Sequence, residues 1–170
     1  MYADSATVDP NTLYQGDILE NFPFYILDKP QSVKKEEDGS FSLEQEAATS
    51  DLHVIGSKTQ RVILLSQTCD IQRRNNVMIC PVHELAQFIE DNTLNTDSVK
   101  SIRDRKNYYF FYLPAFNGLP ESIADLQTII YVPRAVIAAR ISDRIVPMSD
   151  LGRHHLGWSL ANLFSRPATN

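Results

Sequence analysis

Reactive side chains cluster in residues 61–83 of this chain. Two short apolar runs, Val62–Leu65 and Val77–Ile79, are bounded by turn-forming residues, which is typical of buried strands. The polar and reactive residues at the ends of these runs are Arg61, Ser66, Thr68, Cys69, Asp70, Cys80 and His83. Functional sites are commonly built in this way, because a rigid scaffold holds reactive groups at its edge. Residues 61–83 are therefore the segment where a functional site is most expected.

Cys69 stands between a hydroxyl and a carboxylate, those of Thr68 and Asp70. A thiol at a strand end is nucleophilic when a base lowers its pKa, and His83 is the only histidine nearby in sequence. The charge of Asp70 would instead raise the thiol pKa. A free cysteine is also a common small buried hydrophobic residue, so a catalytic Cys69 is the minor alternative.

A metal site is a second way to use these residues. Cys80 and His83 are separated by two residues, as metal-ligand pairs often are, and Cys69 could approach from the neighbouring strand. Asp70 or His53 would supply a fourth ligand. Structural zinc sites usually show two tight ligand pairs, and only one pair is present here. We therefore expect no metal and keep a zinc or thiol site as an alternative.

The charges are unevenly distributed along the 170 residues. The formal net charge is −5, which argues against a generally basic nucleic-acid binder. Residues 1–60 hold four basic and eleven acidic residues, whereas residues 61–170 hold twelve basic and ten acidic ones, and every arginine lies at or after Arg61. An arginine-bearing face and arginines scattered in surface ion pairs are both compatible with this pattern.

The length predicts one domain over residues 1–170, with a sizeable core. Residues 1–12 are polar and predict a flexible N-terminus, and the strongly polar residues 28–51 predict a loop or insertion. Residues 149–164 predict a C-terminal helix with Ser149 as its N-cap. The residues expected on its apolar stripe are Leu156, Leu160, Leu163 and Phe164, with Trp158 off the stripe.

Several further elements follow from the apolar patterns. The segments expected to form them are a helix at Glu84–Glu90, strands at Tyr108–Leu113 and Ala124–Val132, and a short helical turn at Pro133–Ala139. The order of strands and helices favours an α+β fold with a mainly antiparallel barrel or sheet. The aromatic run at Tyr108–Tyr112 is expected in the core rather than as a base-stacking surface. Arg134, Arg140 and Arg144 could line a groove or a dimer edge, and the solvated surface is the expectation for them.

Four blocks together resemble the MazF/PemK family of small β-barrel proteins. The blocks are Gly16-Asp-Ile18, Arg61-Val-Ile-Leu-Leu-Ser66, Val77-Met-Ile-Cys-Pro-Val82 and Asp125-Leu-Gln-Thr-Ile-Ile-Tyr-Val-Pro-Arg134. They follow the order of the family over most of residues 14–164. The resemblance implies a small, strongly bent, antiparallel SH3-like β-barrel with peripheral helices, and a two-fold homodimer.

Many members of this family are RNA-cleaving toxins, and the resemblance implies a site arginine at Arg61; the other roles follow from side-chain chemistry. Arg61 would stabilise the charge of the phosphate and His83 would transfer protons, since its ordinary pKa suits that role. The remaining residues expected to bind the substrate are Ser66, Gln67, Thr68, Cys69, Asp70 and Arg134. The family carries a Ser or Thr where this chain has His83, and the residues around 28–51 and 91–107 are longer here.

The leading expectation is a toxin-like or defence-associated RNA-binding protein. If cleavage is retained, the protein would be an endoribonuclease that cuts single-stranded RNA. This reaction would need neither a metal ion nor a cofactor. Its partners would be RNA and an antitoxin or another protein. The alternative is a non-catalytic MazF-like binding or regulatory module, which the missing Ser or Thr, the acidic balance and the acidic insertion favour.

A cytoplasmic location without a membrane partner is expected. No apolar run approaches the ~20 residues that span a bilayer. A signal peptide has a basic region followed by an apolar one, and residues 1–10 contain neither. In the cytosol Cys69 and Cys80 would be thiols rather than a disulfide.

Overall fold

The structure of the chain is a computed structural model that describes residues 1–4, 8–27, 33–35, 41–43, 55–91 and 94–165. The chain forms two compact units, of which the first comprises Met1–Phe22 with Gln60–Asn170 and the second comprises Pro23–Thr59. Most of the polar segment 28–51 and His53 lie outside the described residues. In the second unit β2 (Val33–Lys35) pairs antiparallel with β3 (Phe41–Leu43).

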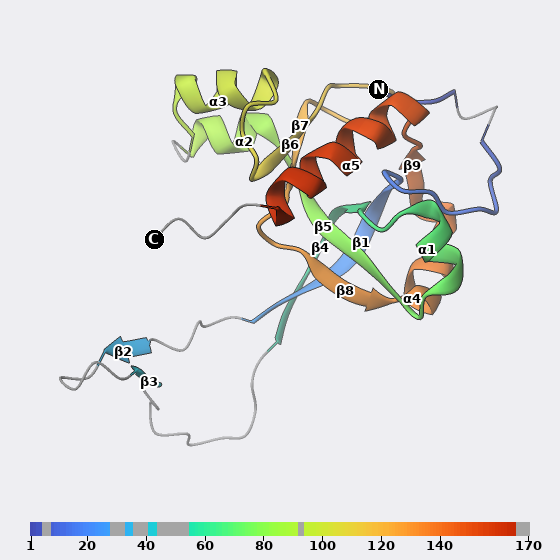
Figure 1. The fold of residues 1–170 in the computed structure, drawn as a ribbon, viewed down its shortest axis with the longest axis horizontal. Helices are drawn as coiled ribbons and strands as arrows, with labels where there is room; N and C mark the ends of the chain where they lie inside the picture. The colour runs from blue at the N-terminus through green and yellow to red at the C-terminus, as the bar shows by residue number, and fades with distance from the viewer. Residues whose placement is uncertain (5–7, 28–32, 36–40, 44–54, 92–93, 166–170) are drawn as a thin grey trace. The chain divides into compact units, whose positions relative to one another are not determined.

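A seven-stranded antiparallel sheet confirms the expected α+β class (Figure 1). Its strands are β1 (Ile18–Leu27), β4 (Ile55–Leu64), β5 (Asn76–Glu84), β6 (Phe110–Leu113), β7 (Ser122–Asp125), β8 (Ile130–Pro133) and β9 (Arg144–Val146). The order is β6-β7-β5-β4-β1-β9, and β8 also pairs with β5. Among the described residues the two end strands, β6 and β9, do not pair, so the sheet is open rather than a closed barrel.

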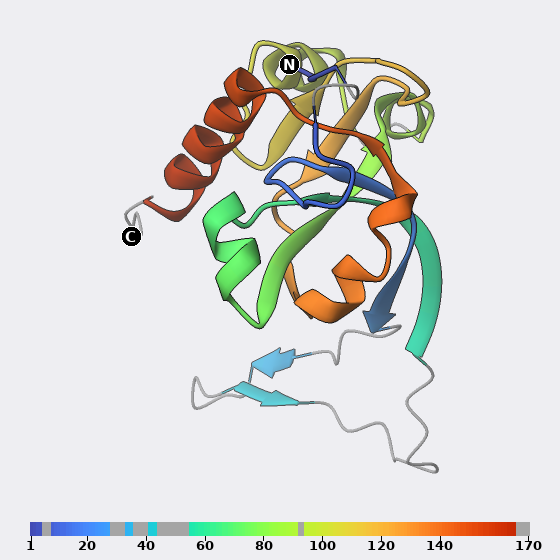
Figure 2. The same cartoon turned by 90° about the vertical axis from the view of Figure 1, so that its right-hand side faces the viewer.

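Five α-helices of the described chain surround this sheet (Figure 2). They are α1 (Thr68–Arg73), α2 (Leu85–Glu90), α3 (Thr96–Arg103), α4 (Arg134–Ala138) and α5 (Asp150–Phe164), and a 3₁₀ turn, η2, spans Ile141–Asp143. The helix α1 lies in a segment whose polar residues predicted only a connection. Within the described parts of the chain, no helix has both the length and the apolar character needed to cross a membrane.

The strand expected at Ala124–Val132 is two strands, β7 and β8, and Asp125 is the reason. Its carboxylate accepts hydrogen bonds from the Gln127 N–H at 2.9 Å and from the Thr128 hydroxyl at 2.7 Å. An aspartate that binds the backbone two residues later forms a turn in place of a continuing strand. The strand is therefore interrupted here, and β8 continues in the same direction along the other half of β5.

The last helix, α5, begins as expected, because the Ser149 hydroxyl accepts a hydrogen bond from the Gly152 N–H at 3.2 Å. Leu156 and Leu160 are buried in the main core, and Trp158 is exposed. The expectation for Phe164 was wrong: this side chain is 64% exposed, because it lies at the end of the helix, away from the sheet.

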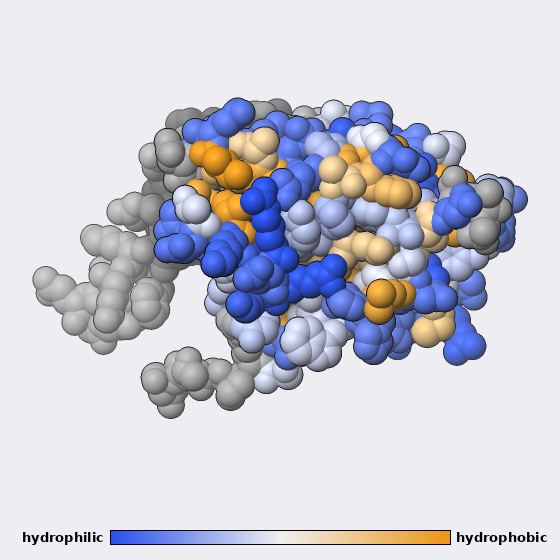
Figure 3. Space-filling view, turned by 90° about the horizontal axis from the view of Figure 1, so that it is seen from above, coloured by the Kyte–Doolittle hydropathy of each residue, from blue (hydrophilic) through white to orange (hydrophobic). Residues whose placement is uncertain are grey.

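Apolar side chains pack on both faces of the sheet. The main core contains Ile63, Cys80 and Phe111 with the inner face of α5. The second core packs α2 and α3 around Ile123. Their separation follows from the strand geometry, because successive side chains of a strand point to opposite faces. On the face of the molecule shown in Figure 3, hydrophobic residues form small patches separated by hydrophilic ones.

Candidate functional site

The two expected catalytic residues, Arg61 and His83, point to opposite faces of the sheet. Arg61 on β4 is directly opposite Val82 on β5, so the two side chains share a face. His83 is the next residue of β5 and is opposite Ile123 of β7. Because side chains alternate along a strand, the structure does not bring Arg61 and His83 together.

Arg61 lies between two carboxylates. Its guanidinium pairs with Glu20 of β1 at 3.1 Å and with Glu84 of β5 at 2.8 Å. Burial opposes the charge of Arg61, but the hydrogen bonds to Glu84 and Glu20 outweigh it and raise the pKa. These partners come from the two strands that flank β4 in the sheet. Its charge is thus balanced by two carboxylates.

His83 is half-buried at the edge of the second core. Its ring lies against Phe88 of α2, with 5.3 Å between the ring centroids and 60° between the planes. This contact is with an apolar side chain that packs on Leu85 and Ile123. His83 therefore lies beside the core that holds α2 against the sheet.

Two of the hydroxyls in the expected substrate-binding group hold the backbone. The Ser66 hydroxyl, which is 6% exposed, accepts a hydrogen bond from the Met78 N–H at 2.8 Å. The Thr68 hydroxyl accepts one from the Gln15 N–H at 3.2 Å. These bonds fix the start of α1 against β5 and against the turn that precedes β1.

Three more residues of that group, Gln67, Cys69 and Asp70, lie at or near the surface. Gln67 and Cys69 are exposed, and the Cys69 thiol approaches the Gln67 side-chain oxygen at 3.8 Å. Asp70 pairs with Arg74, four residues later on the same helix, at 3.5 Å.

The two thiols lie in different surroundings. Cys80 is completely buried in the main core, and burial raises its pKa well above the ordinary value, whereas Cys69 is exposed. Among the residues that the structure describes, no group of three or more His, Cys, Asp or Glu side chains lies close enough to hold a metal ion.

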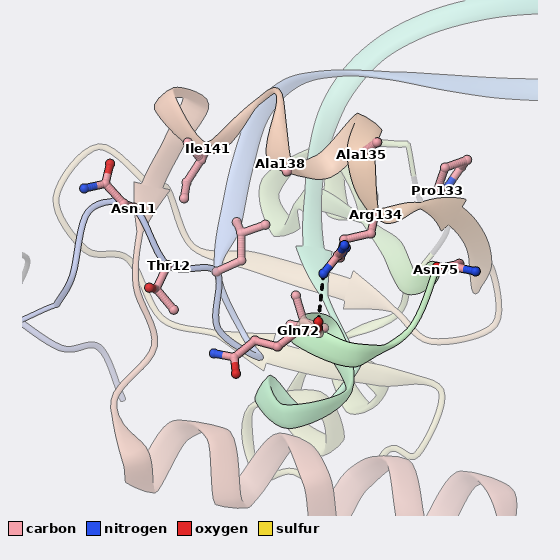
Figure 4. A pocket seen from close by; sticks show the side chains of 11 residues that line it. Asn11, Thr12, Gln72, Asn75, Pro133, Arg134, Ala135, Ala138 and Ile141 are labelled. Carbon is pink, nitrogen blue, oxygen red and sulfur yellow. Dashed lines mark hydrogen bonds between the residues drawn. The ribbon is translucent and has the colours of Figure 1, made fainter.

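A pocket of about 480 Å³ lies between the N-terminal segment, α1 and α4 (Figure 4). Its apolar lining consists of Leu13, Ile71, Pro133, Ala135, Ala138 and Ile141. Its polar lining consists of Asn11, Thr12, Gln72, Asn75 and Arg134. Of the residues expected to bind substrate, only Arg134 contributes to this lining.

Arg134 extends its guanidinium into the pocket (Figure 4). One of its N–H groups donates to the Gln72 carbonyl oxygen at 2.7 Å, and its backbone N–H donates to the Asn75 carbonyl at 2.8 Å. These two bonds hold it against the end of α1. Within the described parts of the chain no carboxylate pairs with Arg134. Its other guanidinium N–H groups are therefore available to an anion.

Exposed cationic and aromatic residues adjoin the lining residues in the sequence. Arg73 and Arg74 stand between two lining residues in the sequence, and both are exposed. Tyr131 of β8 is 70% exposed. It shares the outer face of the strand with Pro133, about 7 Å along, which lines the pocket. An exposed ring thus lies next to the arginine-bearing hollow.

A buried ion pair anchors the N-terminal wall of the pocket. The Arg144 guanidinium donates to Asp17 at 3.0 Å, to the Thr12 carbonyl at 2.7 Å and to the Asp9 carbonyl at 3.0 Å. Asp17 is completely buried, and burial raises its pKa, although the Tyr14 N–H and Arg144 oppose this change. The Arg144 side chain is 10% exposed and is held in this ion pair rather than solvated at the surface, contrary to expectation.

The polar lining residues were missed from the sequence, apart from Arg134. The run Gln72-Arg-Arg-Asn-Asn76 carried a signal, since five consecutive polar residues before a buried strand are unusual. The residues at Asn11 and Thr12 carried none, because they reach the pocket only through the fold. A scan of protein-family models and a search of curated proteins found no match to this chain.

Proposed function

We propose that this protein is a single-stranded RNA-binding module that uses the pocket around Arg134 and does not cleave the RNA. It is related in fold to the MazF/PemK proteins, with a bent sheet of the SH3-like type. The observation that carries the proposal is Arg134, a pocket arginine without a carboxylate partner among the described residues.

An arginine in this position suits a phosphodiester. The guanidinium offers planar, paired N–H donors that match phosphate oxygens, and it keeps its charge at any relevant pH. Arg73, which has no carboxylate partner in the described chain, adds a second positive charge close by in sequence. A net charge of −5 does not prevent this, because the local potential decides where an anion binds.

The exposed ring of Tyr131 favours a single strand over a duplex. Bases stack on aromatic side chains only where they are unpaired, and such stacking contributes about 1–3 kcal/mol per base. A tyrosine that is 70% exposed next to a basic hollow is the combination that single-strand binding requires.

Binding without cleavage is favoured by the arrangement of Arg61 and His83. A phosphodiester in reach of one is not in reach of the other, because they point to opposite faces. The guanidinium of Arg61 is already neutralised by two carboxylates. On this proposal, expression of the protein does not arrest growth, as it would for a toxin that cleaves RNA.

The test compares Arg134→Gln with Arg103→Gln in binding to a short, unstructured, end-labelled RNA, followed by fluorescence anisotropy. Arg103 is the matched control, because its Nε and one terminal guanidinium nitrogen pair with Glu121, which does not line the pocket. We expect Arg134→Gln to weaken binding about tenfold and to reduce the slope of log K against log salt by about 0.7. The control should bind like the parent protein.

Two results would overturn the proposal. The first is a parent protein that does not bind the RNA, or an Arg134→Gln variant that binds it equally well. The second is cleavage of the RNA by the metal-free parent that both Arg61→Ala and His83→Ala lose, which would restore the endoribonuclease.

A further inference from the structure

The pocket is larger than one arginine–phosphate contact requires. Its volume of about 480 Å³ falls within the range of sites that enclose small molecules. Arg134 occupies one side, whereas Thr12 and the side-chain amide of Gln72 lie on the other side of the hollow (Figure 4). The remaining space is bordered by Leu13, Ile71 and Ile141.

The charges of the lining restrict the chemistry of the ligand. Arg134 is the one ionisable side chain among the lining residues, and no carboxylate belongs to them. A ligand that fits has one anionic end and an uncharged body. The apolar lining favours a flat or apolar body, and the amides favour polar groups at its edge.

The amide of Gln72 is suited to such an edge. It makes no hydrogen bond to any described residue, and it presents one acceptor beside two donors. A side-chain amide can pair with the neighbouring donor and acceptor of a nucleobase edge, as asparagine and glutamine do with adenine. The backbone carbonyl of Gln72 meanwhile accepts a hydrogen bond from Arg134 and fixes that guanidinium in the pocket.

We propose that the pocket receives one nucleotide unit of the RNA, with its base turned out of the strand. The phosphate binds Arg134, the base lies over Leu13, Ile71 and Ile141, and the edge of the base faces the Gln72 amide. Unstacked bases of single-stranded RNA are commonly recognised in this way. This inference rests on the proposed function and names the ligand unit that the same site takes.

The first test uses the four nucleoside 5′-monophosphates and ribose 5-phosphate, with binding measured by calorimetry. We expect at least one monophosphate to bind at least about tenfold more tightly than ribose 5-phosphate. The Gln72→Ala variant should lose most of that difference while it keeps its affinity for ribose 5-phosphate, because its backbone carbonyl remains. The control is Gln127→Ala, an exposed glutamine of the turn between β7 and β8, outside the pocket.

The second test separates this inference from the proposed function. The labelled RNA is compared with the same RNA in which single nucleotides are replaced by abasic ones. If the intact RNA binds in an Arg134-dependent manner and every abasic version binds equally well, the base-recognition inference is wrong and the RNA-binding function stands. Equal affinities for ribose 5-phosphate and the monophosphates would also overturn the inference. No binding of any RNA would overturn the function itself.

Discussion

Arg61 lies between the carboxylates of Glu20 and Glu84, and Ser66 and Thr68 accept backbone hydrogen bonds. At the scale of single residues, side chains with reactive chemistry therefore serve mainly to position the strands and α1. The reason is that a buried or half-buried polar group is costly unless it has a partner. Arg134 differs, because it lies at the edge of a hollow where water or a ligand can complete its hydrogen bonds.

Asp17 gives a prediction for the dependence of stability on pH. Burial raises the pKa of its carboxyl, so the folded protein binds the proton more tightly than the unfolded chain. Its contribution to stability is therefore fully present below the unfolded-state pKa and is lost as the pH rises through the folded-state pKa. We expect the free energy of unfolding of the parent to fall, relative to that of Asp17→Asn, as the pH rises from about 4.

Urea unfolding of the two proteins across this range measures the difference directly. The Asn side chain does not titrate, so the variant reports the contribution of all other groups. A difference that stays constant or grows in favour of the parent as the pH rises would contradict the assignment of a raised pKa to Asp17.

At the scale of elements, the N-terminal residues are bound to the beginning of α5. The Met1 carbonyl accepts hydrogen bonds from the N–H and the hydroxyl of Ser149, both at 2.9 Å, and Tyr2 bridges Met148. Gly152 permits this approach, because a Cβ atom there would collide with the Met1 carbonyl oxygen and the Met148 side chain. At the second glycine of α5, Gly157, an added Cβ atom would lie in open space.

These two glycines form a matched pair for a stability measurement. We expect Gly152→Ala to destabilise the protein by about 1–3 kcal/mol, since overpacking outweighs the gain in helix propensity. Gly157→Ala should stabilise it by about 0.5–1 kcal/mol, because the alanine restricts the unfolded chain and nothing opposes its methyl group. Thermal unfolding followed by circular dichroism gives both signs. Equal shifts in the same direction would show that the contact with Met1 is not formed.

At the scale of the whole molecule, ion pairs join parts of the chain that are distant in sequence. Asp17 and Arg144 connect the turn before β1 to β9, and Arg61 connects β1, β4 and β5. The first pair also holds the segment that supplies Asn11 and Thr12 to the pocket. The shape of the pocket therefore depends on contacts that the folded sheet makes possible.

If Arg61 stabilises the fold and Arg134 binds RNA, substitution of Arg61 should change stability and leave RNA binding unchanged. We expect Arg61→Met to lower the free energy of unfolding by about 1 kcal/mol, since both of its ion pairs are partly exposed to solvent. Its affinity for RNA should equal that of the parent. An RNA affinity reduced as strongly as in Arg134→Gln, with unchanged stability, would instead place Arg61 in the binding site.

The sequence by itself determined the features that depend on neighbouring residues. The apolar runs around Val62 and Val77 form strands, the helix capped by Ser149 begins where its hydroxyl predicts, and Leu156 and Leu160 are buried. Each of these follows from local periodicity and hydrogen bonding, which are encoded in a few consecutive residues. The α+β class follows from the order of these elements.

Only the tertiary structure decided which side chains meet. The register between β4 and β5 sets Arg61 and His83 on opposite faces, and a shift of one residue would reverse either side chain. The pocket joins Thr12, Gln72 and Arg134, which are separated by long stretches of chain. Such contacts depend on the path of the whole backbone, and no local pattern encodes them.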